Sequence, residues 1–346
     1  MRIHPTRLQN FCAGVFAACG MRSAQSLRAA EILVDANRQG LVTHGVSRLP
    51  VYAACLRSGR INPNPSLVME RRAAALGLVD GDNGLGLLVA DEAMRQAMAL
   101  ANDSGAGFVT VRNSSHCGAV SYYCRQATAQ GKIGMAFTNA PSAMPPWGGS
   151  SPYFGTNPIA IAFPGPDGED VVVDLSTSVT ARGRIIQAAR EGRSIPEGWA
   201  VDRAGRSTTD PKRALEGAVL PMAGPKGYAL ALAVELLAGV LAGAAWGTHV
   251  GWMYDDGAEP VRIGHAFLAI DVAPLVALPV FTQRVALLVA EIKSQPVAAG
   301  SQGILIPGER RRESARRNAD GIELSDAVVS ELAACAERAG APALVM

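Results

Sequence analysis

The chain of 346 residues is apolar and nearly neutral: hydrophobic residues make up 49% of it, charged residues 18%, and the formal net charge is +2. This balance excludes a disordered chain, which is poor in apolar residues, and argues against a nucleic-acid-binding protein, which carries a strong basic excess. At roughly 150 residues per domain, the length predicts about two domains.

The first predicted elements in chain order are two helices, at residues 26–39 and 44–56. Apolar residues recur at helical spacing along the first helix, which ends at Gly40. Pro50 fits the second helix only if it lies in the first turn. The later elements are predicted as a strand at 73–80, a helix at 93–101 closed by Gly105, a strand at 108–111, a helix at 119–130, strands at 133–137, 159–163 and 171–174, a buried helix at 226–246, a strand at 265–271, a helix at 285–292 and a last helix from about 325.

Three of these strands, at 133–137, 159–163 and 171–174, follow one another without a helix between them. A parallel pair needs a long crossover, usually a helix. We therefore predict an α/β fold with a mixed, largely antiparallel sheet and helices packed around it. The dinucleotide fingerprint G-x-G-x-x-G is absent, which argues against a Rossmann domain. Residues 190–225, rich in Pro and Gly, predict a long ordered excursion over the surface.

Other features narrow the class of protein. The six cysteines are scattered, so we expect reduced thiols in a cytoplasmic protein. No metal site is expected, because the adjacent Asp255 and Asp256 have no further ligand at a suitable spacing. No membrane partner is expected, because the one long apolar stretch has Glu235 near its centre. The run Arg310-Arg311-Arg312 has acidic neighbours and predicts a solvated helix face rather than a nucleic-acid contact.

The first polar cluster is Thr43-His44-Gly45-Val46-Ser47-Arg48, with Tyr52 beyond it. On a continuous helix, His44, Arg48 and Tyr52 would lie along one face. Such a face suits a small carboxylate, because a guanidinium forms a bidentate pair with it. The alternative is a helix capped by Thr43 that exposes a polar face to solvent.

The second cluster is Asn113-Ser114-Ser115-His116-Cys117-Gly118-Ala119, directly after a predicted strand. Histidine titrates near neutral pH, so His116 could take a proton from an alcohol and return it. The alternative is a structural histidine. Cys117 is a weak candidate for a nucleophile, because sequence neighbours do not pair as a Cys–His couple requires.

Further polar segments could bind phosphate through backbone N–H groups, although plain turns look the same. They are Gly155-Thr156-Asn157-Pro158, which enters a predicted strand, and Asp174-Leu175-Ser176-Thr177-Ser178, at the end of another. Lys226 lies between Pro225 and Gly227 at the start of the long apolar helix, where a helix N-terminus favours an anion.

Taken together, these segments resemble the malate/L-lactate dehydrogenase family of NAD(P)-dependent oxidoreductases, which lacks a Rossmann fold. The matching segments occur in family order: Thr43-His44-Gly45 with Arg48, 113–119, 155–158, 174–178, 208–211, 225–228 and 307–309. Within the family, segments 116–122, 195–202, 223–228 and 253–256 are most similar to the ureidoglycolate dehydrogenase branch. Two positions depart from the family pattern: Thr43 replaces a frequent Ser, and Ala140 replaces a Ser that contacts the cofactor.

The resemblance implies a homodimer in which residues 1–115 and 310–346 form a helical, substrate-side domain and residues 116–309 form the nucleotide-binding domain. It implies that His116 is the acid/base, with His44 assisting, that Arg48 holds the substrate carboxylate, and that Tyr52 orients the substrate. The cofactor, NAD with NADP as the alternative, is expected to contact Asn139, Thr156, Asp174, Leu175, Ser176, Lys226, Pro307, Gly308 and Glu309.

The function implied is hydride transfer between nicotinamide and C2 of a small 2-hydroxy carboxylate, with a ureidoglycolate-like substrate favoured. Alternatives within the family are malate, lactate or sulfolactate dehydrogenases and reductases of cyclic imino acids such as piperideine- or pyrroline-2-carboxylate. A catalytically silent ligand-binding protein is a further alternative, and the presence of both His116 and Arg48 argues against it.

Overall fold

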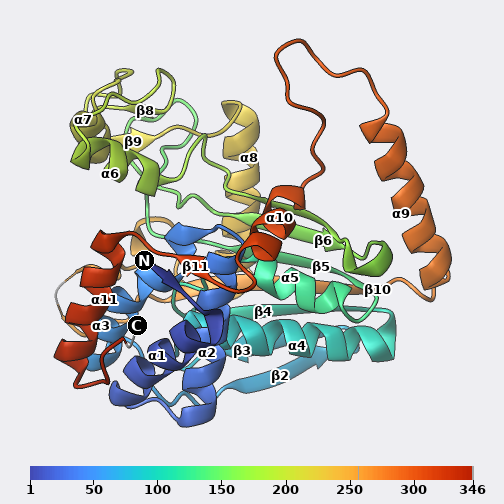
Figure 1. Ribbon diagram of the computed structural model, residues 1–346, viewed down its shortest axis with the longest axis horizontal. Helices are drawn as coiled ribbons and strands as arrows, with labels where there is room; N and C mark the ends of the chain where they lie inside the picture. Colours follow the sequence, from blue (N-terminus) through green and yellow to red (C-terminus); the bar gives the residue numbers. More distant parts are fainter. Residues whose placement is uncertain (256, 345–346) are drawn as a thin grey trace.

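A seven-stranded sheet forms the centre of the computed structural model, which describes residues 1–255 and 257–344 (Figure 1). Asp256, at the end of segment 253–256, lies outside the described residues. The sheet order is β2–β3–β4–β10–β5–β6–β7, and of the pairings in the described chain only β3 with β4 is parallel. The predicted mixed, largely antiparallel sheet is confirmed. The strands are β2 (Val68–Ala73), β3 (Leu76–Asp80), β4 (Ala106–Ser114), β5 (Lys132–Thr138), β6 (Ile159–Phe163), β7 (Val171–Leu175) and β10 (Ile263–Asp271).

Helices surround this sheet, and most of the predicted ones are confirmed. Pro50 lies in the first turn of α3, where its missing N–H costs no hydrogen bond. Gly105 closes α4 in the left-handed conformation. The helices are α1 (Pro5–Ala18), α2 (Ser23–Arg38), α3 (Leu49–Arg57), α4 (Gly86–Ser104), α5 (Ser121–Thr128), α6 (Arg182–Arg190), α7 (Pro211–Glu216), α8 (Pro225–Val234), α9 (Leu278–Lys293), α10 (Glu309–Arg317) and α11 (Asp326–Ala339).

The sheet is covered on both faces. In Figure 1, α4 and α5 lie on the near face and α8 lies behind the sheet. Gly107 on β4 lets α4 approach closely, because a Cβ there would lie 2.1 Å from the carbonyl oxygen of Ala97. The helical segment Glu235–Val240, which continues α8, packs against β10, β5 and β4.

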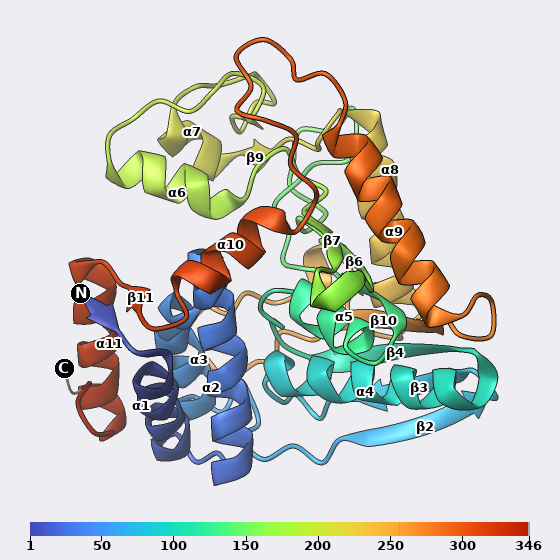
Figure 2. The ribbon, with the colours of Figure 1, turned by 45° about the vertical axis from the view of Figure 1, so that its right-hand side comes forward.

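The two ends of the chain lie together in a helical layer. Strand β1 (Arg2–Ile3) pairs with β11 (Ile322–Glu323), and α11 packs against α3 and α1 (Figure 2). The same sheet contains β2, β3 and β4 from the first part of the chain and β5, β6, β7 and β10 from the middle. The division into two domains at residue 115 stays a prediction.

The structure corrects or refines several of the predicted elements. The strand at 73–80 is wrong at its start, because β2 and β3 form a hairpin that turns at residues 74–75. The excursion at 190–225 is ordered, and it contains α7 and a small sheet of β8 (Ala200–Val201) and β9 (Ala218–Val219) over its own apolar cluster.

The helix predicted at 226–246 is shorter and less buried than expected. It ends as an α-helix at Val234 and continues as a π-helical segment to Val240. Small side chains such as Ala231 and Ala238 are buried, whereas Leu236 and Leu241 are 49% and 61% exposed. In the described part of the chain, no helix combines the length and the apolar character needed to cross a bilayer.

Candidate active site

A cavity of about 630 Å³ contains most of the predicted site residues. It lies where the segment before α3, the loop after β4, the end of β7, the start of α6 and the segment 252–254 come together. Residues from distant parts of the sequence therefore meet at one place. The predicted residues that line it are His44, Arg48, Tyr52, His116, Thr156, Asp174, Leu175 and Ser176.

The segment that carries His44 and Arg48 is not the continuous helix that the sequence predicted. Two short 3-10 turns, Val42–His44 and Val46–Arg48, are separated at Gly45, whose φ of −95° and ψ of −146° break the helix. A Cβ at residue 45 would lie 1.9 Å from Asn37 Oδ1, which accepts a hydrogen bond from the Val46 N–H. The prediction that His44, Arg48 and Tyr52 lie on one helix face is therefore wrong, although all three side chains line the same cavity.

The guanidinium of Arg48 is held at the cavity wall by two hydrogen bonds. Its Nε donates to the carbonyl oxygen of Thr43 at 2.7 Å, and its Nη1 donates to the Tyr254 hydroxyl at 2.6 Å. These bonds restrict the guanidinium before a substrate arrives, so less conformational freedom is lost when a carboxylate binds.

His116 sits just beyond β4, and its position is fixed by its neighbours. Ser115 Oγ accepts from the Gly86 N–H at 2.8 Å, which ties this turn to the start of α4. His116 Nδ1 lies 2.6 Å from the Tyr52 hydroxyl and 3.3 Å from the Gly118 nitrogen. The His116 ring also stacks on His44, with centroids 5.8 Å apart and an interplanar angle of 23°.

Both stacked histidines are poor bases in this setting. Burial lowers the pKa of His116 well below its ordinary value, and the nearby Arg48 guanidinium lowers it further. Burial, followed by the same guanidinium, lowers the pKa of His44 to about 4. At neutral pH both rings are therefore neutral.

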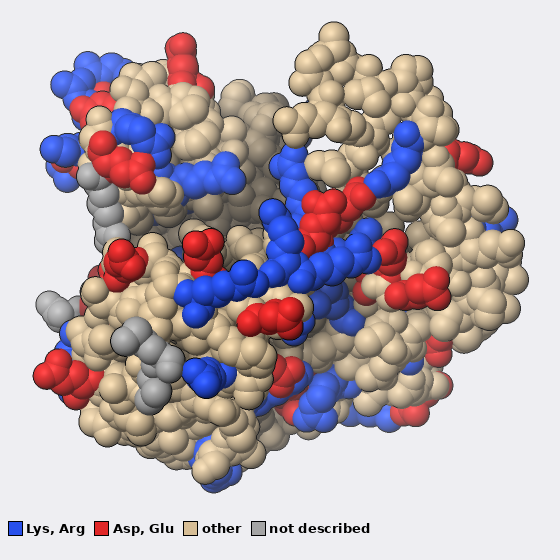
Figure 3. All heavy atoms as spheres, in the orientation of Figure 1, with Lys and Arg blue, Asp and Glu red and all other residues tan. Residues whose placement is uncertain are grey.

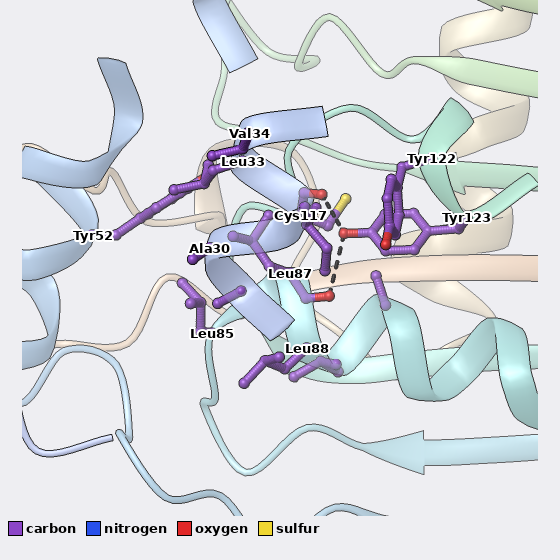
Figure 4. Close-up of a cluster of buried hydrophobic side chains, with 14 of the residues drawn as sticks. Ala30, Leu33, Val34, Tyr52, Leu85, Leu87, Leu88, Cys117, Tyr122 and Tyr123 are labelled. Atoms are coloured by element: carbon purple, nitrogen blue, oxygen red, sulfur yellow. Dashed lines mark hydrogen bonds between the residues drawn. The ribbon is translucent and has the colours of Figure 1, made fainter. Parts of the chain in front are cut away.

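An apolar cluster surrounds Cys117, the residue that follows His116 (Figure 4). The Tyr123 hydroxyl donates to the carbonyl oxygen of Cys117 at 2.6 Å and lies 3.3 Å from that of Leu87. Cys117 is 2% exposed, and burial raises the pKa of its thiol. A protonated, buried thiol is a poor nucleophile, which argues against the alternative that Cys117 is a nucleophile.

Asp174, at the end of β7, is paired with a residue that the sequence analysis did not assign to the site. Its carboxylate accepts from Arg311 Nη1 at 2.6 Å, and the same nitrogen donates to Ser121 Oγ at 2.8 Å. Figure 3 shows a row of basic side chains over α10 with acidic ones beside it, but Arg311 is only 22% exposed and lines the cavity. The prediction of a solvated face is wrong for this arginine. Arg311 could have been identified from segment 307–309, which precedes it and marks where α10 begins.

Five predicted cofactor residues are not among those that line the cavity: Asn139, Lys226, Pro307, Gly308 and Glu309. The Asn139 amide donates to Glu235 at 3.2 Å and to Ala245 at 2.7 Å, and it accepts from Gly264, so its polar atoms are engaged inside the protein. Lys226 is exposed in the first turn of α8.

The loop at 307–309 has a clear structural part in the fold. The Val172 N–H donates to the carbonyl oxygen of Pro307 at 3.0 Å, and Glu309 Oε2 accepts from the Ile306 N–H at 3.0 Å. Gly308 precedes α10 with a φ of +96°, a conformation that favours glycine. The loop thus joins β7 to α10, and cofactor contacts by its residues stay predictions.

Basic side chains outnumber acidic ones around the cavity. Arg182 lies 5.3 Å from the Trp252 ring centroid and donates to the carbonyl oxygen of Leu215 at 3.1 Å. Among the charged side chains that line the cavity, four are basic and one is acidic: Arg48, Arg182, Arg184 and Arg311, and Asp174. This surplus fits anionic ligands, namely a dinucleotide and a carboxylate. Arg182 could not be found by sequence reasoning, because only the fold brings α6 to the site.

Comparison with known proteins finds relatives that match nearly the whole chain. A family model described as malate/L-lactate dehydrogenase matches residues 3–333. The L-sulfolactate dehydrogenase of Methanocaldococcus jannaschii is 38% identical over 96% of this chain and 95% of its own. A solved sulfolactate dehydrogenase structure from that organism superposes with a TM-score of 0.91 at 37% identity, covering 99% of this chain and 98% of the other.

Two further relatives differ in the cofactor that their names carry. The (2R)-3-sulfolactate dehydrogenase (NADP+) of Chromohalobacter salexigens is 36% identical over 95% of this chain and 96% of its own. The ureidoglycolate dehydrogenase (NAD+) of Escherichia coli K12 is 32% identical over 96% of this chain and 95% of its own. The expected family resemblance is confirmed over nearly the whole chain.

Proposed function

The chain belongs to the malate/L-lactate dehydrogenase family of NAD(P)-dependent 2-hydroxy acid dehydrogenases, and we propose that His116 and Arg48 carry its reaction on a small 2-hydroxy carboxylate. The observation that carries the proposal is their meeting in one cavity, although they are 68 residues apart in the sequence. His116 handles the proton on the substrate oxygen, and Arg48 holds the carboxylate.

Each residue contributes a different part of the rate. Arg48 offers two parallel N–H groups to the carboxylate, which fixes the position of C2. Such orientation converts an encounter into a near-unimolecular step and supplies much of the acceleration. His116 exchanges a proton with the oxygen on C2, and His44 stacks on its ring and limits its rotation.

The cofactor site belongs to the same cavity. Thr156, Asp174, Leu175 and Ser176 would hold the dinucleotide, with Arg311 positioned by Asp174. When bound, the nicotinamide supplies or accepts the hydride. We favour NAD, the cofactor named for the ureidoglycolate relative, with NADP, named for the sulfolactate relative of Chromohalobacter, as the alternative. Asn139, Lys226 and residues 307–309 would contribute from outside the cavity.

A ureidoglycolate-like substrate is the first choice. Its support is the similarity of segment 253–256 to that branch, because Tyr254 of this segment bonds to Arg48, the proposed carboxylate clamp. A second anion on the substrate, as in sulfolactate or malate, is the alternative. Arg182 favours it, since this partly buried arginine lines the cavity and has no carboxylate partner among the described residues.

We also propose a homodimer, as the family resemblance implies. Helix α9 stands at the outside of the molecule (Figure 2), and it has no buried residue in the described chain. Leu287 and Leu288 on this helix are 58% and 56% exposed. An apolar helix of this kind is a surface that a second copy would cover.

A substrate panel tests the proposed function. The purified protein is incubated with NAD+ or NADP+ and ureidoglycolate, sulfolactate, malate or lactate, and with NADH or NADPH and piperideine-2-carboxylate, while the absorbance of the reduced cofactor is followed. We expect the highest kcat/KM for ureidoglycolate, and for sulfolactate if Arg182 binds a second anion. A His116→Ala preparation controls for contaminating dehydrogenases. No turnover of any hydroxy acid or cyclic imine would overturn the proposal in favour of a silent ligand-binding protein.

A further inference from the structure

We propose that Tyr52 is a positioning residue that acts through His116, holding the resting ring in the tautomer that presents Nε2–H to the cavity. Sequence reasoning had expected the Tyr52 hydroxyl to orient the substrate. The consequence for catalysis rests on the proposed function, whereas the tautomer itself is a property of the free protein.

The Gly118 backbone N–H requires His116 Nδ1 to accept a hydrogen bond. This N–H lies 3.3 Å from His116 Nδ1, and a backbone amide nitrogen can only donate. The Nδ1 atom must therefore offer a lone pair. Gly118 has a φ of +69°, a left-handed conformation, and a Cβ there would lie 2.8 Å from Leu87 Cδ2. Glycine at this position therefore lets the turn bring this N–H back toward the ring.

The Tyr52 hydroxyl lies 2.6 Å from the same Nδ1 atom. Because Nδ1 carries a lone pair, the hydroxyl must donate its hydrogen to it. Tyr52 is fully buried on α3, and burial raises the pKa of its phenol, so it remains a donor across the physiological range. With two donors directed at Nδ1, the single proton of the neutral ring is on Nε2.

A carboxylate partner would give the opposite result. A carboxylate accepts from Nδ1–H and leaves a lone pair on Nε2, ready to act as a base. Here a phenol hydroxyl and an amide N–H both donate to Nδ1, so the ring proton is on Nε2 and this nitrogen is a donor. In the part of the chain that the structure describes, Nε2 has no hydrogen-bond partner, and His116 lines the cavity.

This tautomer favours one side of the reaction. An Nε2–H group donates to the carbonyl oxygen of a 2-oxo acid or to an imine nitrogen, both of which are acceptors. A hydroxy acid can give its proton to Nε2 only after the ring has moved its own proton to Nδ1, where the Tyr52 hydroxyl would turn to accept it. The resting site is thus arranged to receive the oxidised form of the substrate.

Nitrogen-15 NMR of the full-length protein with labelled histidine tests the proposal without any substrate. The chain has five histidines, so their ring signals are resolvable, and a His116→Gln variant identifies those of His116. At neutral pH we expect a protonated Nε2 and an unprotonated Nδ1 for His116. The opposite tautomer, or a ring protonated at both nitrogens, would overturn the proposal. This measurement on the wild-type ring does not depend on a Tyr52 variant, so it decides even if Tyr52→Phe fails to fold.

Tyr52→Phe separates positioning from packing, because Phe keeps the ring and loses the hydroxyl. We expect the two His116 nitrogen signals to move toward each other as the tautomers mix, and kcat to fall about tenfold for the loss of one hydrogen bond, with cofactor binding unchanged. His265 is the internal reference, since its ring nitrogens lie 2.7 Å from Thr138 Oγ1 and 2.8 Å from Ser114 Oγ. Unchanged His116 signals in Tyr52→Phe would show that the hydroxyl does not set the tautomer. Correct signals in a protein without turnover would leave this inference standing and reject the proposed function.

Discussion

At the scale of single residues, the proposed function assigns binding of the carboxylate to Arg48 and proton transfer to His116. Arg48 is restrained by Thr43 and Tyr254, and His116 by Tyr52 and Gly118. Each functional side chain is therefore held by partners of its own, which is how a site keeps its geometry without substrate.

Arg48→Lys should be poorly tolerated. A lysine ammonium is a point charge that cannot form the paired bonds of a guanidinium, so we expect kcat/KM to fall roughly 10- to 100-fold, the cost of about 1.4–2.8 kcal/mol. Steady-state kinetics on the best substrate of the panel measure it. Arg57→Lys, at the exposed end of α3, the helix that follows Arg48, is the matched control. An unchanged KM in Arg48→Lys would argue against a carboxylate clamp.

The identity of both residues could be predicted from the sequence, because the clusters around His116 and Arg48 are local. Their geometry could not. The spacing of residues 44, 48 and 52 predicts one helix face, but the backbone at Gly45 interrupts the helix. Glycine is required there because the Asn37 side chain occupies the space that a Cβ would need. That contact comes from another helix and is invisible to local periodicity.

At the scale of elements, one ion pair joins α10 to the part of the cavity that is proposed to bind the cofactor. Arg311 joins α10 to Asp174 on β7 and to Ser121 on α5. Successive strands without intervening helices predicted the antiparallel part of the sheet, whereas the docking of α10 depends on tertiary contacts between residues about 137 positions apart.

Arg311→Met should loosen α10. Met fills much of the same space but leaves Asp174 without its partner, so we expect the free energy of unfolding to fall by about 1–3 kcal/mol and cofactor affinity to weaken. Urea unfolding and cofactor fluorescence titration measure the two effects. Arg310→Met, on the exposed neighbour, is the control. Equal behaviour of the two variants would contradict the role of this ion pair.

Helix α9 gives a second test at this scale. If a second copy covers it, Leu288→Glu places a charge in an apolar contact, and the protein should become monomeric. Light scattering after size-exclusion chromatography gives the mass. Leu27→Glu, at an exposed leucine on α2, is the control. A dimer that persists in Leu288→Glu, or a monomeric wild type, would reject α9 as the dimer surface.

At the scale of the whole molecule, buried neutral histidines link stability to pH. Burial lowers the pKa of His44 to about 4, of His265 to about 3, and of His116 well below the ordinary value of 6.5. Below about pH 6.5 the unfolded chain therefore binds protons that the folded chain does not. The free energy of unfolding decreases as the pH is lowered.

The slope follows from proton linkage. Between pH 6.5 and about 4, each of these histidines should remove up to about 1.4 kcal/mol of stability per pH unit. Urea unfolding at pH 7, 6 and 5 measures it. His265→Gln should reduce the slope by about one third. A stability that is constant from pH 7 to 5 would show that these rings are not buried as neutral groups.

The central claim, that His116 carries the proton in a hydride-transfer reaction, is tested most directly by single-turnover kinetics of His116→Ala. With cofactor binding measured separately by fluorescence, the account predicts that cofactor affinity is retained while turnover falls roughly 10²- to 10⁴-fold. Turnover close to that of the wild type would contradict it.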